Sequence, residues 1–158
     1  MSNVLRIKRS LISVSDKTKI VPFAKDLAKE DIEIISTGNT FKELKKNKIN
    51  VKKIEEVTSF PEILSGRVKT LHPKIFGGIL ANKLDQSHTR QLKQHSILEI
   101  QLVVVNLYPF KETIKISNNI NKCIENIDIG GPSLIRAAAK NFLSTAIITD
   151  KDDYKKVI

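Results

Sequence analysis

The stretch "LVVVNLYPF", residues 102–110, constrains the fold more than any other part of the chain. Its apolar residues follow one another without the alternation that marks a strand with one solvated face. A strand of this kind is buried on both faces, as in parallel sheets that are covered by helices. We therefore expect a central strand of an α/β domain here.

The rest of the chain alternates between strand and helix patterns, the βαβ rhythm of a parallel sheet. Residues 58–79, which contain Pro61 and Pro73, are less regular. The sequence predicts a single α/β domain over residues 1–158, doubly wound or nearly so. Strands are expected at 10–15, 32–37, 102–110 and 144–150, an extended segment at 51–57, and helices at 16–30, 40–48, 88–97, 118–127 and 130–141, with another starting at 152.

Composition narrows the classes of function. The single cysteine, Cys123, excludes an internal disulfide and favours a reducing compartment. We expect it in the core, because it shares an apolar helical face with Ile120, Ile124 and Ile127. The start of the chain does not have the apolar run of a signal peptide, and no segment approaches the ~18 apolar residues of a membrane helix. A cytoplasmic protein without membrane contact is expected.

The net charge of +10 raises the possibility of nucleic-acid binding. Only five of the 27 basic residues are arginine, and aromatic residues make up 5% of the chain. The sequence has no basic cluster interleaved with side chains that could stack on bases. We therefore expect an anionic small molecule as the ligand and no nucleic acid.

Small polar residues follow the first two predicted strands. Hydroxyls, a glycine and a helix N-terminus suit a phosphate group, which needs short-range donors and close approach of the backbone. Ordinary helix capping explains the same residues equally well. The two groups are Ser13, Ser15 and Lys17, then Ser36, Thr37, Gly38 and Thr40.

Further polar groups fall in the second half of the chain and around residues 66–78. Asn106 and Tyr108 leave the central strand, and Asp128 precedes the glycine pair that opens the predicted helix at 130–141. Packing and capping remain alternatives for all three. Lys140 shares a face of that helix with Arg136. The three histidines lack metal-ligand spacing, so we expect no metal and, without a Walker A or dinucleotide motif, no nucleoside triphosphate or dinucleotide.

The segments "SVSDKT", "STGNT", "FPEILSGRVKTLHPKIFGGIL", "VVNLYPF" and "ENIDIGGPSLIRAAAKN" together resemble the IMP cyclohydrolase domain, the N-terminal part of a bifunctional purine-biosynthesis enzyme. The resemblance covers essentially the whole chain. It implies a methylglyoxal-synthase-like three-layer fold with a mostly parallel central sheet. It also implies closure of FAICAR (5-formamidoimidazole-4-carboxamide ribonucleotide) to IMP with loss of water, no cofactor, and a homodimer. The C-terminal transformylase domain of that enzyme is not expected within these 158 residues.

The resemblance also assigns residues. Lys69 looks like the principal catalytic group, with Tyr108, Asp128 and Lys140 as its partners; acid and base are not distinguished among them. Substrate-binding positions implied in the same way are Ser13, Ser15, Lys17, Ser36, Thr37, Gly38, Thr40, Arg67, Thr70, Asn106, Ile129 and Gly130, while His72, Pro73, Gly77 and Gly78 are expected to shape the loop.

Three positions depart from the family pattern. Asn39 replaces a glycine, and we expect it to tolerate a left-handed backbone there. Phe76 and Phe142 replace histidines, and no function is carried onto them. A regulatory nucleotide-binding domain of the same fold and a methylglyoxal synthase remain competing hypotheses.

Overall fold

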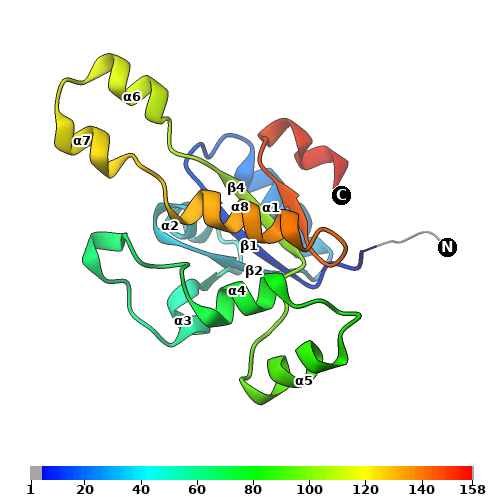
Figure 1. Ribbon diagram of the computed structural model, residues 1–158. Helices are drawn as coiled ribbons and strands as arrows, with labels where there is room; N and C mark the ends of the chain where they lie inside the picture. The colour runs from blue at the N-terminus through cyan, green and yellow to red at the C-terminus, as the bar shows by residue number, and fades with distance from the viewer. Residues whose placement is uncertain (1–4, 158) are drawn as a thin grey trace.

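The computed structural model describes residues 5–157 and has a five-stranded parallel sheet at its centre (Figure 1). The strand order is β3-β2-β1-β4-β5, and every adjacent pair is parallel. This confirms the predicted α/β class and the parallel sheet. The strands are β1 (Arg9–Val14), β2 (Glu33–Ser36), β3 (Lys52–Lys53), β4 (Leu102–Asn106) and β5 (Ala146–Ile148).

Helices cover both faces of the sheet, so the predicted three layers are confirmed. The helix at 118–127 is shorter than predicted, and the last element of the described chain is a 3-10 helix. The helical elements are α1 (Ile20–Lys29), α2 (Gly38–Lys46), α3 (Ile54–Thr58), η1 (Leu64–Gly66), α4 (Pro73–Leu80), α5 (Gln86–Gln94), α6 (Phe110–Ile116), α7 (Ile120–Glu125), α8 (Gly130–Lys140) and η2 (Lys151–Lys156).

Alternate side chains of the central strands pack into two separate cores, one on each face of the sheet. Ile12 and Val104 pack with α1, α2 and η2, whereas Leu11 and Val103 pack with α3, α4 and α8 on the other face. All four side chains are at most 1% exposed. Because successive strand residues point to opposite faces, a strand between two helical layers must be apolar throughout. This is the physical reason for the unbroken apolar run in β4.

Three local predictions are wrong. The segment at 58–79 contains α4, because His72 caps the helix by accepting a hydrogen bond from Lys74 N (3.1 Å) and Pro73 occupies the first turn. The glycines at 77 and 78 therefore lie inside a helix. Within 51–57, only Lys52 and Lys53 are extended.

The prediction that Cys123 lies in the core is also wrong. It lies on α7, which together with α6 forms an arm that extends away from the sheet (Figure 1). Cys123 itself is half-buried, and Ile120, Ile124 and Ile127 beside it are exposed. The amphipathic pattern indicated an apolar face correctly, but nothing within residues 5–157 covers that face.

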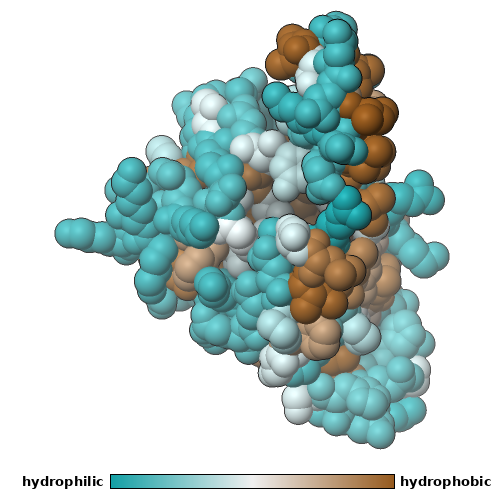
Figure 2. Space-filling model, turned by 90° about the vertical axis from the view of Figure 1, so that its left-hand side faces the viewer, coloured by the Kyte–Doolittle hydropathy of each residue, from teal (hydrophilic) through white to brown (hydrophobic). Residues whose placement is uncertain are grey.

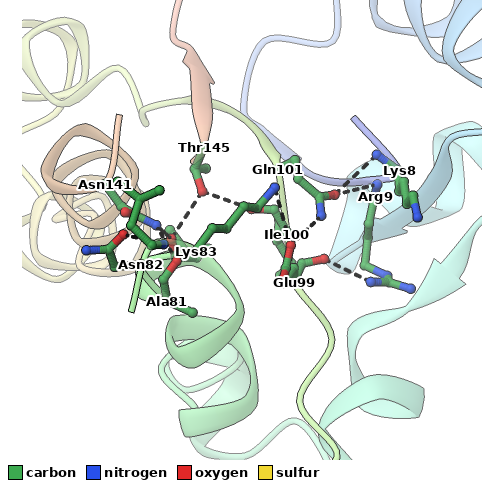
Figure 3. Close-up of polar contacts among 12 residues, drawn as sticks. Lys8, Arg9, Ala81, Asn82, Lys83, Glu99, Ile100, Gln101, Asn141 and Thr145 are labelled. Atoms are coloured by element: carbon green, nitrogen blue, oxygen red, sulfur yellow. Dashed lines mark hydrogen bonds and ion pairs between the residues drawn. The ribbon is translucent and has the colours of Figure 1, made fainter. Parts of the chain in front are cut away.

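The amino end of the sheet is closed by a network of polar side chains (Figure 3). Asn141 follows α8 and donates through Nδ2 to the carbonyls of Ile79 (2.7 Å) and Ala81 (3.0 Å) at the end of α4. Thr145 donates to the Ile79 and Ile100 carbonyls. These bonds satisfy carbonyls that α4 leaves unpaired and tie α8 to α4.

Gly78 provides a test of the packing between α4 and the chain that enters β4. A Cβ at this position would lie 2.4 Å from the backbone oxygen of Leu98, whereas one on Gly77 would meet only the Ile97 side chain, at 3.1 Å. We expect Gly78→Ala to lower the free energy of unfolding by about 1–3 kcal/mol, the usual cost of overpacking. Urea denaturation measures this.

Gly77→Ala is the matched control, because the Ile97 side chain can rotate and alanine favours a helix. We expect its free energy of unfolding to equal or exceed that of the wild type. Equal stability of the two variants would contradict the close backbone contact at Gly78.

Candidate functional site

The sheet changes winding direction between β1 and β4, and there the carboxyl ends of the strands leave a crevice in folds of this class. Asn106 at the end of β4 bridges the two strands. Its Oδ1 accepts hydrogen bonds from the backbone N–H groups of Ser15 (2.6 Å) and Asp16 (2.9 Å), and its Nδ2 donates to the Asp16 carbonyl (2.9 Å). The amide thus has three partners in the loop after β1, and one N–H is left for a ligand.

The hydroxyl groups beside this crevice divide into two kinds. Ser36 donates to the Ile12 carbonyl (2.8 Å), and Thr40 bonds both the N–H and the carbonyl of Val14, so these two hold β1 against β2 and α2. Ser13 and Thr37 instead face each other, with oxygens 3.1 Å apart. The Ser13–Thr37 pair retains capacity for a further hydrogen bond at the strand ends.

Gly38 opens α2 with a φ of +46°. The positive φ therefore belongs to Gly38, and Asn39 lies within the helix, so this turn does not require a left-handed backbone at Asn39. Thr37 precedes the helix without capping it through its side chain. The first-turn N–H groups of a helix have no intrahelical partners and carry the positive end of its dipole, which suits an anion.

Lys69, in the loop between α3 and α4, contacts this end of α2. A Cβ on Gly38 would lie 3.2 Å from Lys69 Nζ, so the ammonium group sits against the first residue of α2. Its ion-pair partner in the described chain is Glu62, with Nζ and Oε1 3.3 Å apart. Thr70, the next residue, is buried.

The N-terminus of α8 approaches the same loop. A Cβ on Gly130 would lie 3.0 Å from Thr70 Oγ1. Asp128 Oδ1 accepts a hydrogen bond from Gly131 N (2.7 Å), and a Cβ on Gly131 would collide with both Asp128 and Leu107, the residue before Tyr108. The Lys69–Thr70 segment thus lies between two helix N-termini.

Other predicted site residues lie at the margin of this cluster. Arg67 forms an exposed ion pair with Glu125 of α7, and its hydrogen bond lowers the pKa of that carboxyl. Tyr108 and Ile129 are each at least half exposed. Lys17 Nζ folds back onto the Ser15 carbonyl (3.1 Å).

Lys140 lies at the opposite end of α8 from the glycine pair. It is the last residue of α8, ten positions after Gly130, and a helix rises about 1.5 Å per residue, which separates their Cα atoms by about 15 Å. Its neighbour Asn141 belongs to the network at the opposite edge of the sheet (Figure 3). The role of Lys140 as a partner of Lys69, which the family resemblance implies, stays a prediction.

The sequence did not single out the carboxylates that pair with the loop cations, Glu62 and Glu125. Glu62 stands seven residues before Lys69 in a segment without a regular pattern, and the two side chains meet only because the loop folds back. Asp16 was also missed. The hydrogen bond from Lys151 holds the pKa of its carboxyl well below the usual range.

Three further observations limit what the site can be. The described residues contain no group of three or more His, Cys, Asp or Glu side chains arranged to hold a metal ion. None of the helices in residues 5–157 has the length and apolar content needed to cross a bilayer. A hollow of about 270 Å³ lies away from the crevice, near the start of β1 and β2, and its lining includes Arg9 and Glu33.

Comparison with known proteins identifies related chains. Residues 19–133 match the model of the MGS-like domain family. The chain is 56% identical over 151 residues to the bifunctional purine biosynthesis protein PurH of Clostridioides difficile (strain 630), covering 96% of this chain and 30% of that protein. It is 54% identical over 155 residues to PurH of Bacillus subtilis (strain 168), covering 98% and 30%. The chain thus spans about 30% of the length of the curated relatives it matches.

A solved structure described as "Crystal structure of ForH" has the same fold. It superposes with a TM-score of 0.84 at 32% sequence identity, over 96% of this chain and 76% of that one. The fold described above is therefore shared with a protein of experimentally determined structure.

Replacing Asn106 tests whether its amide holds the crevice together. We expect Asn106→Ala to lower the free energy of unfolding by about 1–3 kcal/mol, because the N–H groups of Ser15 and Asp16 lose their acceptor. Asn39→Ala, at an exposed helix position, is the control and is expected to leave stability within about 0.5 kcal/mol of wild type. Chemical denaturation of both variants decides the point; an unchanged midpoint for Asn106→Ala would show that the bridge is dispensable.

Proposed function

Because the chain belongs to the family of MGS-like domains, we propose that it is an IMP cyclohydrolase domain. In the proposed reaction the carboxamide nitrogen of FAICAR attacks the formyl carbon. A C–N bond forms, the formyl oxygen becomes a hydroxyl, and that hydroxyl leaves as water to give IMP. The observation that carries the proposal is the 50–57% identity to PurH over nearly the whole chain.

The reaction places three demands on a site. A carboxamide nitrogen is a weak nucleophile, so the two reacting groups must be held in contact. The formyl oxygen gains negative charge during attack and needs donors, and its departure as water needs a proton. The 5′-phosphate of the nucleotide offers binding energy away from the reacting atoms.

The described geometry can meet these demands. The N-terminus of α2 with the Ser13–Thr37 pair is suited to the phosphate, with Arg67 at the margin. We propose that Lys69 stabilises the developing oxyanion or transfers the proton. Asp128 accepts a hydrogen bond at the N-terminus of α8, where the N–H of Gly130 can contact the base, and Tyr108 follows Leu107, which meets the same helix end. Lys140, at the far end of α8, remains a proposed catalytic partner that the family motif implies.

We also propose that the domain acts in the cytoplasm and as a homodimer. The support for association is an apolar surface on the α6–α7 arm. Figure 2 shows a strip of hydrophobic residues along one side of the molecule, which begins at the top of the view and continues downward. The members on the arm are Ile114, Ile116, Ile120, Ile124 and Ile127, exposed by 45–80%.

Ring closure is tested directly with purified protein. We expect it to convert FAICAR to IMP without added metal, as followed spectroscopically, and Lys69→Ala to lower kcat by about 10²–10⁴-fold, the range for loss of an acid–base or oxyanion group. Full activity of a folded Lys69→Ala variant would refute the catalytic assignment alone. Binding of IMP without any turnover by the wild type would instead favour a regulatory nucleotide-binding domain.

Association is tested by sedimentation velocity. We expect the wild type to sediment as a dimer, and Ile116→Asp combined with Ile120→Asp to shift it toward the monomer, because burying two unpaired carboxylates at an interface is costly. Lys115→Asp on the same arm changes charge without touching the apolar face and serves as the control. A monomeric wild type at all concentrations would rule out a dimer of this chain.

A further inference from the structure

We propose that Glu62 is a positioning residue for Lys69: its carboxylate holds the ammonium group at the N-terminus of α2 before substrate arrives. The inference rests on the proposed function and adds to it an acidic residue that acts through the lysine. It is drawn from the fold of the loop between α3 and α4.

The backbone of this loop places Glu62 opposite Lys69. Ile63 and Val68 form an antiparallel β-bridge. In an antiparallel pairing the sum of the two residue numbers is constant along the ladder, so the pair next to Ile63 and Val68 is Glu62 and Lys69. The ion pair between Oε1 and Nζ, at 3.3 Å, follows from that register.

The turn that closes the bridge is built to keep this register. Leu64, Ser65 and Gly66 all have positive φ values, of 52°, 53° and 88°. Hydrogen bonds from Gly66 N to the Ile63 carbonyl (3.0 Å) and from Arg67 N to the Leu64 carbonyl (3.1 Å) hold the turn. Left-handed backbone at residues other than glycine costs energy and persists where the surroundings determine it.

Gly66 also leaves the space that the ion pair occupies. A Cβ there would lie 2.6 Å from Glu62 Oε1, 2.6 Å from Lys69 Cε and 2.7 Å from Lys69 Nζ. The absence of a side chain at this position therefore lets the two charged groups cross over the turn. The glycine at position 66 thus supports the Glu62–Lys69 ion pair, in addition to the β-bridge and the turn.

Electrostatics explains why the lysine needs a carboxylate. Its Nζ lies against Gly38, at the positive end of the α2 dipole. A helix N-terminus favours anions and disfavours a cation. The Glu62 carboxylate offsets this repulsion and keeps the ammonium beside the place where an anionic substrate would bind.

The same carboxylate is repelled by the substrate, which gives a kinetic signature. Removing its charge should loosen Lys69 and lower the rate of the chemical step, while anion binding in the ground state is unchanged or tighter. A merely structural defect would weaken binding and turnover together. A fall in kcat without a rise in KM is therefore the result that distinguishes positioning from general damage.

The experiment measures kcat and KM for FAICAR closure in the wild type, Glu62→Gln and Glu62→Asp. We expect Glu62→Gln to lower kcat by about tenfold with KM unchanged or reduced, and Glu62→Asp to lie between Gln and wild type, because the charge is kept but retracted. Glu30→Gln, an exposed carboxylate at the C-cap of α1, removes the same charge far from the crevice and should match the wild type. Circular dichroism checks folding of each variant.

A double variant tests whether Glu62 acts through Lys69. In the Lys69→Ala background, Glu62→Gln should cause no further fall in kcat, because coupled residues are not additive. A further tenfold fall, or wild-type kinetics for a folded Glu62→Gln, would overturn the inference while leaving the proposed function intact. If Glu62→Gln does not fold, an Asp variant with raised KM overturns it as well. An inactive wild type would refute the proposed function and the inference with it.

Discussion

The parallel pairing of β1 with both β2 and β4 is the constraint on which the site depends. Parallel strands end at the same edge of a sheet, so their loops meet although they lie far apart in the chain. Ser13 and Thr37, 24 residues apart, come within hydrogen-bonding distance, and Asn106 reaches Ser15 across 91 residues. The buried apolar residues of the three strands fix this register, because a slip of one residue would exchange the two cores.

Electrostatic balance at the carboxyl edge follows from that arrangement. The first turns of α2 and α8 both face the Lys69–Thr70 segment, so the positive ends of two helix dipoles lie beside the Lys69 cation. Each cation of the loop is paired with a carboxylate, Lys69 with Glu62 and Arg67 with Glu125. The Glu62 carboxylate allows the Lys69 cation to remain beside the N-terminus of α2 before an anion binds.

The sequence predicted the layers of the fold well because buried faces of helices and strands show apolar residues at regular spacing. It failed where the same pattern has two structural meanings. The proline and glycines around Phe76 indicated a loop, but Pro73 at the first turn and Gly78 at a close helix contact both suit a helix. The apolar face around Cys123 indicated a core position, yet periodicity identifies an apolar face without saying which surface covers it.

Site residues were predictable to the extent that strand ends and helix starts are predictable. Ser13, Thr37, Gly38 and Asn106 fall at such points, and the structure places them at the carboxyl ends of adjacent strands. Glu62 could not be found this way, since its contact depends on three consecutive left-handed residues that no periodic pattern encodes. An acidic residue near a basic loop is common in any sequence. It gains meaning here because an antiparallel bridge sets it opposite one lysine, and that lysine faces a helix dipole that would otherwise repel it.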